Sequence, residues 1–240
     1  MDKAVSKTRS GPNPLGQKRP PIRRPGEALG GYAYRVLREA IRSGNFQPGE
    51  HLRETDVAHW LGISRTPVRE AFHRIITEGL VTNGPWNGVM IADLDEDQLR
   101  QLYAVREALE GTAAALAAQH ATEPDVKQML EILETEAGAL GDPKRLVILN
   151  GKFHQTLYRA SHNHYLLQSV NSVVDALGLL RRSTFVLPGS IELAHGEHQK
   201  IVEAIRLRRP TDAEHAARLH VRNALLTRRK LRSVQPSEPS

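Results

Sequence analysis

Three segments of the sequence each set one histidine among apolar residues at helical spacing, and histidines in such positions can ligate a metal ion. They are His154, His198 and His220. A single inward-facing histidine is most often a hydrogen-bonded core residue. Three of them on separate helices fit a shared site better, and Asn150, one turn before His154, would add an amide oxygen from the same face. The sequence therefore predicts a metal site formed by Asn150, His154, His198 and His220.

The available ligand types limit the choice of metal. The chain contains no cysteine, which excludes disulfides and thiolate ligands. Nitrogen and oxygen ligands suit a divalent ion such as Zn²⁺, Ni²⁺ or Mn²⁺, with coordination positions left open for an effector. Because the amide of Asn150 is a poorer partner for a dication than a carboxylate, we expect a weak site, or one that fills only together with an anionic effector. We predict surface or structural roles for the other histidines after residue 100, which are His120, His162, His164, His195 and His215.

One arginine is also predicted to face the core. Arg106 continues an apolar stripe that includes Leu102 and Leu109. If the effector carries a carboxylate, this guanidinium would complement its charge, so Arg106 is a candidate effector-binding residue. Glu110 lies one helical turn further on, so a structural ion pair between the two side chains is the alternative.

A second group of reactive side chains lies nearer the N-terminus, at the start of a predicted helix. A guanidinium fork can bond O6 and N7 of one guanine in the major groove, which is worth about 1–3 kcal/mol of discrimination between bases. Arg65 and Arg69 are placed for this role, whereas Ser64 and Thr66, at the positively polarised helix start, suit phosphates. These four residues are the predicted DNA contacts of the helix. A basic outer face is by itself usually just solvated surface.

The elements that would position these four residues form a winged helix-turn-helix. A first helix runs from about Tyr32 to a stop at Gly44, a second ends at Gly62, and a third starts after Ser64 with a proline in its first turn. Two β-prone runs around a glycine-rich turn, within residues 80–91, predict a hairpin. Through Asn87 and Gly88, the hairpin is expected to touch the DNA backbone or the minor groove.

The rest of the chain predicts a helical bundle. Breaks near residues 122–124, 141–143, 162–163, 188–189 and 209–210 divide residues 95–232 into six helices without a strand pattern between them. The expected fold is therefore mainly α. The predicted domains are a disordered basic tail (1–28), a winged helix-turn-helix (29–93), an all-helical domain for effector binding and dimerisation (94–232) and a second disordered tail (233–240).

Composition and charge agree with a globular protein that binds a polyanion. The 240 residues are 40% hydrophobic and 25% charged, with a net charge of +6. Residues 1–28 hold seven basic and two acidic side chains, a net of +5. That tail is either a solubilising extension or a salt-sensitive grip on DNA phosphates. No run of about 18 apolar residues and no leader-like apolar segment are found, which favours a soluble cytoplasmic protein without a membrane partner.

The sequence around the third helix also resembles a known family. LGISRTPVREA at residues 61–71, with PGEHL at 48–52 and EGLV at 78–81, closely resembles the DNA-binding domain of the GntR family of bacterial repressors, over residues 30–92. The resemblance implies a homodimer whose two recognition helices read the halves of a palindromic operator in double-stranded DNA. The family's contact positions match Ser64, Arg65, Thr66 and Arg69. Thr55 and Asn87 stand where some members carry a DNA-contacting arginine, so the operator sequence is not transferable.

The helical half resembles the FadR-type branch of that family, whose ligand-binding domain is all-helical and of the FCD type. The resemblance rests on REALE at 106–110, NGKFH at 150–154, EH at 197–198 and a histidine twenty-two residues later, within residues 95–230. In metal-binding members an Asp or Asn and three histidines hold the ion. The matching positions here are Asn150, His154, His198 and His220.

These observations together predict a sequence-specific transcriptional repressor, not an enzyme, whose operator affinity is controlled by a small carboxylate-bearing metabolite. A metal-dependent hydrolase using the three-histidine site is one alternative, since such a site could activate water. It lacks an HExxH motif and an evident general base. A non-specific architectural DNA binder is the other alternative, and it would leave the inward-facing histidines unexplained.

Overall fold

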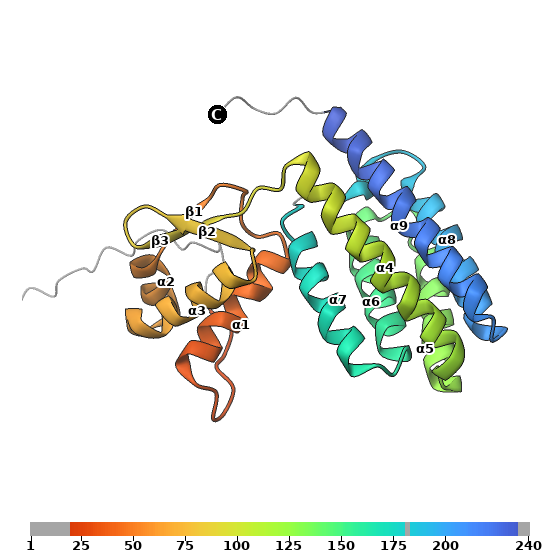
Figure 1. Ribbon diagram of the computed structural model, residues 1–240, viewed down its shortest axis with the longest axis horizontal. Coiled ribbons are helices and arrows are strands. Elements are labelled where there is room, and N and C mark those ends of the chain that lie inside the picture. The colour runs from red at the N-terminus through yellow and green to blue at the C-terminus, as the bar shows by residue number, and fades with distance from the viewer. Residues whose placement is uncertain (1–19, 181–182, 235–240) are drawn as a thin grey trace, which may run out of the picture. The chain divides into compact units, whose positions relative to one another are not determined.

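The computed structural model describes residues 20–180 and 183–234, and it divides into two compact units (Figure 1). The first unit extends to Leu94 and includes residues 174–180. The second unit comprises residues 95–173 and 183–234. Within the described ranges no helix is long and apolar enough to span a membrane.

The first unit is a three-helix fold with a small sheet. Its helices are α1 (Leu29–Arg42), α2 (Glu54–Leu61) and α3 (Arg65–Thr77). Its strands are β1 (His51–Arg53), β2 (Val81–Gly84) and β3 (Gly88–Ile91), in the antiparallel order β1-β3-β2. The predicted helices and hairpin are confirmed. Strand β1 was not predicted, because three residues are too few to show an alternating pattern.

The connection between α2 and α3 sets the start of the third helix. Gly62 takes a left-handed conformation (φ 67°) at the end of α2, which a residue without Cβ adopts at little cost. Ser64 is the N-cap residue of α3, and its hydroxyl makes no capping hydrogen bond. Val68 and Phe72 are buried in the core of the unit. Burial of that apolar face holds the opposite face of α3 toward solvent.

Residues 20–28, the end of the predicted basic tail, contact α1. The Tyr32 hydroxyl donates to the Pro21 carbonyl oxygen at 2.8 Å. Arg35 donates to the Glu27 carboxylate through Nε at 2.7 Å and Nη2 at 2.8 Å. The predicted tail residues 1–19 and 235–240 lie outside the described residues.

The described chain after residue 94 contains six α-helices, as predicted. They are α4 (Glu96–His120), α5 (Glu123–Ala137), α6 (Pro143–Ala160), α7 (His164–Leu177), α8 (Ser190–Arg206) and α9 (Pro210–Ser233). A short 3₁₀ helix, η1 (Thr184–Val186), lies between α7 and α8. Several helices begin at the chemical signals expected of them. Asp95 and Gln98 form a capping box at α4, and Pro210 occupies the first turn of α9.

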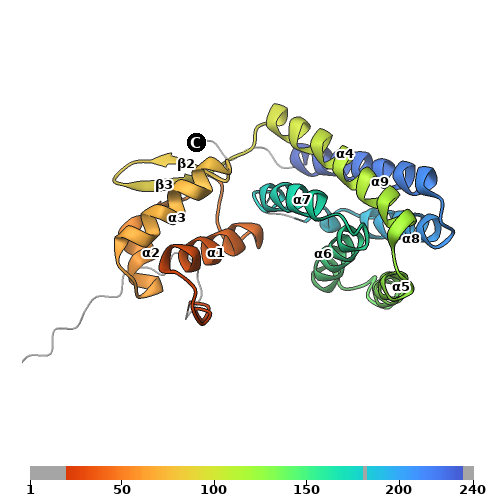
Figure 2. The ribbon, with the colours of Figure 1, turned by 60° about the horizontal axis from the view of Figure 1, so that its bottom comes forward.

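Close packing of α4 against α9 organises the second unit. The two helices run side by side in both views (Figures 1 and 2), and α8 packs on α9. Small residues on α4 permit the close approach: Ala113, Ala114 and Ala117 are buried, and a Cβ at Gly111 would come within 2.8 Å of the Arg218 side chain. This arrangement brings the inward faces of α4, α8 and α9 together.

Candidate DNA-reading surface and metal centre

The predicted DNA-contacting residues of α3 share one exposed end of that helix. Ser64, Arg65, Thr66 and Arg69 are all exposed. The Ser64 hydroxyl makes no capping hydrogen bond, so it remains able to bond a phosphate oxygen. The structure therefore presents these four side chains together, and their contact with DNA remains a prediction.

A buried carboxylate holds both arginines. Glu54, the first residue of α2, is only 5% exposed. Arg69 donates to it through Nε at 2.9 Å and Nη2 at 3.0 Å, and Arg65 donates through Nη2 at 3.0 Å. Hydrogen bonds from Arg69 lower the pKa of Glu54, burial opposes the shift, and Arg65 adds to the lowering. Glu54 thus holds the two guanidinium groups side by side.

We expect Glu54→Gln to reduce the preference for specific over scrambled DNA about tenfold, because one good base contact is worth about 1–3 kcal/mol and the arginines would lose their orientation. Losing one negative charge should also raise affinity for scrambled DNA. The number of counterions released on binding, which sets the slope of affinity against salt concentration, should rise by up to about one. Fluorescence anisotropy over a salt series measures both effects. Glu39→Gln, on the exposed surface of α1, removes the same charge and serves as the control. Equal behaviour of the two variants would contradict the role given to Glu54.

The hairpin places one predicted contact at its tip and gives the other a structural reason. Asn87 is exposed in the turn between β2 and β3. Gly88 lies against β1, where a Cβ would come within 2.6 Å of the Leu52 carbonyl oxygen and would also collide with the His51 ring. Glycine is therefore required there by strand packing. Direct DNA contact by Asn87 and Gly88 remains a prediction.

The three predicted metal-binding histidines converge inside the second unit. His154 comes from α6, His198 from α8 and His220 from α9, and all three are buried. Their ring centroids are 4.9–5.3 Å apart, and one nitrogen of each ring can be chosen so that all lie within 4.8 Å of one another. Sequence spacing alone predicted that each would face inward, and the structure brings them to one point.

Each histidine has a carboxylate beside its Nδ1 atom. The Nδ1 of His220 lies 2.8 Å from Glu197 Oε2, and that of His198 lies 3.3 Å from Glu136 Oε2. His154 Nδ1 is 3.1 Å from Glu110 Oε2, which is within ion-pair distance, without forming a hydrogen bond. A carboxylate at Nδ1 favours the tautomer that leaves Nε2 unprotonated and able to bind a metal.

The unused nitrogens fit a cation. Within the described part of the chain, the buried Nε2 atoms of His154 and His198 have no hydrogen-bond partner. Leaving such atoms unsatisfied costs free energy, which metal ligation would offset. Burial lowers the pKa of His198 to about 3 and also lowers that of His220, so both rings are neutral, as ligation requires, at neutral pH. The donor set therefore fits a divalent ion.

Two of the carboxylates beside the histidines, Glu110 and Glu136, have lowered pKa values. Burial works against ionisation of Glu110, but Arg106 and His154 outweigh it and hold the pKa of Glu110 well below its usual value. Burial likewise opposes ionisation of Glu136, and His198 with His195 outweighs it, so that the pKa of Glu136 is lowered. Negative charge in the layer behind the rings raises their basicity as ligands.

The other two predicted site residues of the second unit are Asn150 and Arg106. Asn150 is partly buried on α6, one turn before His154, and its place in the ligand set remains a prediction. The buried Arg106 donates through Nε to Glu110 at 2.5 Å, which is the ion pair considered as the alternative. Effector binding by Arg106 remains a prediction, while its contact with Glu110 links it to His154.

Several of these partners could not be found in the sequence. Glu110, one turn after Arg106, is expected from the sequence as an ion-pair partner of that arginine but not as a neighbour of His154, and Glu197 is marked only by its place before His198. No sequence signal marks Glu54 or Glu136, because the side chains that they contact belong to other helices. His195, predicted to be a surface or structural residue, lies with its Nδ1 3.1 Å from Glu136 and thus contacts the same carboxylate as His198.

A winged helix-turn-helix followed by an all-helical domain is an architecture found among DNA-binding transcriptional regulators. The model of bacterial regulatory proteins of the gntR family matches residues 30–91, and that of the FCD domain matches residues 101–223. The chain belongs to the GntR family and carries an FCD domain. These assignments exclude the hydrolase considered above, because the family and the relatives are transcriptional regulators.

Proteins of similar sequence or structure support this assignment. The chain is 30% identical over 191 residues to the HTH-type transcriptional regulator YdhC of Bacillus subtilis, covering 78% of this chain and 84% of the relative. It is 27% identical over 198 residues to the HTH-type transcriptional repressor GlaR of Escherichia coli, covering 78% and 90%. The solved structure of E. coli McbR/YncC has the same fold, with a TM-score of 0.75 at 21% identity over 85% of this chain and 98% of that one.

Proposed function

We propose that this GntR-family regulator is a repressor whose operator affinity is set by a small carboxylate-bearing metabolite, bound at a metal ion inside the FCD domain. The observation that carries the proposal is the convergence of three buried histidines, each with a carboxylate at Nδ1. A purely structural cluster would not need unpartnered Nε2 atoms in its centre. The relative GlaR, named a transcriptional repressor, supports the direction of regulation.

His154, His198 and His220 would hold the ion, with Asn150 as an oxygen donor. The metal, when bound, supplies a Lewis-acidic centre that attracts an anionic ligand. The protein's own part is positional. Glu136 and Glu197 orient the rings of His198 and His220, while Arg106 fixes Glu110 beside His154. Because three neutral imidazoles and the Asn150 amide add no charge, a carboxylate from the effector would supply the anionic donor that the set lacks.

On the DNA side, α3 would enter the major groove with Ser64, Arg65, Thr66 and Arg69 at its leading end. A homodimer would read two halves of a palindromic operator, one α3 in each half. Effector binding would then shift the dimer between two spacings of its α3 helices, which changes operator affinity through the differential affinity of the effector for the two states. The change in operator affinity cannot exceed that difference.

We expect a carboxylate metabolite to raise the melting temperature of the metal-loaded protein and to change its operator affinity about 5- to 150-fold, the usual size of a coupling between two sites. A panel of small mono- and dicarboxylates, screened by thermal shift and then by anisotropy on an operator selected in vitro, tests this. The same compounds should do neither to His220→Ala, which lacks one ligand. If no carboxylate that binds alters operator affinity, the sensing function is wrong.

A further inference from the structure

His195 lies in a chain of hydrogen bonds that starts at the surface of the second unit and ends at His198. The exposed Gln199 places its amide nitrogen 3.1 Å from His195 Nε2. His195 Nδ1 lies 3.1 Å from Glu136 Oε2, and His198 Nδ1 lies 3.3 Å from the same oxygen. The side chain of His195 is 13% exposed, whereas that of His198 is 1% exposed. The chain therefore leads from solvent to the buried histidine cluster.

The partners in this chain fix where its protons lie. An ionised carboxylate only accepts hydrogen bonds, so both histidines donate to Glu136 through Nδ1. An amide nitrogen only donates, so the Gln199 amide requires an unprotonated Nε2 on His195. In a neutral imidazole, a proton on Nδ1 leaves Nε2 unprotonated, so a single tautomer of His195 satisfies both of its contacts. His195 is thus a fixed donor to Glu136.

Glu136 decides which way the His198 ring is turned. The fully buried Phe153 stacks on this ring, with centroids 3.9 Å apart and planes inclined by 22°. Stacking fixes the plane of the ring, but a half-turn about the Cβ–Cγ bond keeps that plane and exchanges Nδ1 with Cδ2 and Nε2 with Cε1. Among the described residues His198 Nε2 has no hydrogen-bond partner, so the bond to Glu136 distinguishes the two orientations.

Glu136 needs a second donor because of its place in the fold. It is buried as the penultimate residue of α5, whose last turn holds no basic residue. A carboxylate there meets the negative end of the helix dipole, and its burial adds a desolvation penalty. The N–H groups of two imidazoles offset both effects, and His195 makes the shorter contact. Without His195, the carboxylate would depend on His198 alone.

The other two carboxylates beside the histidines each have an anchor on the side away from the ring. Glu110 accepts a hydrogen bond from Arg106, and Glu197 accepts one from Asn223, each at 2.5 Å. His195 occupies the corresponding place at the third carboxylate. Each of the three histidines therefore has a carboxylate beside it, and each carboxylate has a donor of its own.

We propose that His195 is a positioning residue of the metal centre, which holds Glu136 against His198 and so keeps His198 Nε2 turned toward the ion. This role rests on the metal-binding function proposed for the three histidines. His195 would touch neither the metal nor the effector. Its influence passes through Glu136, because a carboxylate that is free to move or to take up a proton no longer selects one orientation of the ring.

Titration of Co²⁺ alone into the full-length, metal-free protein measures the effect on affinity. His195→Leu removes the donor and should lower Co²⁺ affinity about tenfold, the lower end of the range for partners behind a ligand. His195→Asn places an amide N–H where Nδ1 was and should restore the affinity. His162→Leu breaks a histidine–carboxylate contact with Asp125, in the first turn of α5, and should keep the wild-type affinity as a matched control. If His195→Leu does not fold, His195→Ala replaces it.

A double-mutant cycle shows whether His195 acts through Glu136. Glu136→Gln should itself lower Co²⁺ affinity, and adding His195→Leu to it should cause little further loss, because the group through which His195 acts is already altered. A side chain that only packed against α5 would show its full effect in both backgrounds. Additive losses, or wild-type affinity in His195→Leu, would overturn the proposal.

The tautomer of His198 in the metal-free protein gives a readout that does not depend on the ion. Long-range proton–nitrogen NMR spectra distinguish a proton on Nδ1 from one on Nε2. His198 should carry its proton on Nδ1 in the wild type and in His195→Asn, whereas His195→Leu should populate the other tautomer as well. An unchanged tautomer in His195→Leu contradicts the proposal. If the wild type binds no Co²⁺, the metal-binding function fails, and these spectra alone decide whether His195 orients the ring.

Discussion

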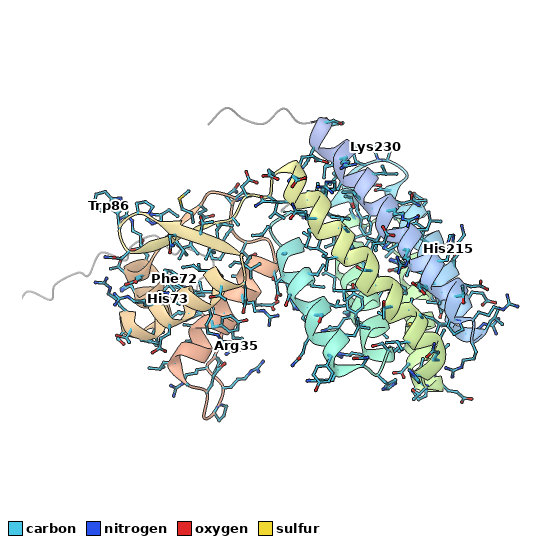
Figure 3. The ribbon with its side chains drawn as sticks, viewed as in Figure 1. Arg35, Phe72, His73, Trp86, His215 and Lys230 are labelled. Atoms are coloured by element: carbon cyan, nitrogen blue, oxygen red, sulfur yellow. The ribbon has the colours of Figure 1, made fainter. Side chains whose placement is uncertain are left out.

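Replacing His154 or His220 with alanine is expected to abolish metal binding, whereas His215→Ala should retain it. By elemental analysis, wild-type protein purified without added metal should carry more divalent ion per chain than the two site variants, and a carboxylate should raise its content toward about one ion per chain. Loss of a direct ligand should lower metal affinity by more than about 100-fold, since even outer-layer partners of a ligand cost about 10–100-fold. His215 lies on the same helix as His220 and is exposed at its surface (Figure 3), so it is a matched control.

The surroundings make these variants informative about the metal rather than about folding. Without His154, Glu110 still accepts from Arg106 at 2.5 Å, and without His220, Glu197 still accepts from Asn223 Nδ2 at 2.5 Å. No carboxylate of the site would then be left buried and unpaired. A chelator should lower the melting temperature of the wild type and of His215→Ala, but leave the two site variants unchanged. Equal metal content in all four proteins would refute the metal centre.

How far the sequence could lead is clearest in the second unit. The helical period alone placed His154, His198 and His220 on inward faces, because one face of each helix must be apolar to be buried and a polar residue on it is conspicuous. Proline and capping signals likewise divided the bundle at the observed breaks. These signals are local, and local signals survive in a single sequence.

Contacts between different helices produce no such local signal in the sequence. Glu136 on α5 reaches a histidine 62 residues later on α8, and Glu54 on α2 reaches Arg69, 15 residues later on α3. Nothing in the spacing marks these carboxylates, since an exposed glutamate on a solvated helix face has the same local sequence. Strand β1 escaped notice for a related reason: its three residues are held by pairing with β3, not by their own pattern.

Four buried carboxylates share one physical role. Glu54 holds two guanidinium groups that are predicted to read DNA, and Glu110, Glu136 and Glu197 lie behind three rings that are predicted to hold a metal. In each case a buried carboxylate restricts the freedom of a side chain that must meet a partner. The entropy of ordering that side chain is then lost on folding rather than on binding.

The second large effect is expected on operator binding, when either of the two α3 arginines held by Glu54 is removed. Arg65→Ala and Arg69→Ala should each weaken binding to the selected operator about 10- to 100-fold, the range of a lost bidentate contact with a guanine. Arg69 should be the more sensitive position. It makes the shorter hydrogen bonds to Glu54, 2.9 and 3.0 Å, while Arg65 makes bonds of 3.0 and 3.3 Å, so without Arg69 the carboxylate retains only the weaker partner.

The salt dependence of binding decides which part of DNA each arginine contacts. If an arginine reads a base, its loss should weaken the operator far more than scrambled DNA and leave the salt dependence nearly unchanged. If it contacts a phosphate, both duplexes should weaken alike and the dependence should fall by about one counterion. Arg206→Ala, which breaks an exposed Arg–Glu pair on α8, removes the same charge and should change neither. Unchanged operator affinity in Arg65→Ala or Arg69→Ala would exclude that residue from the reading surface, and Glu54 would then be only a structural partner.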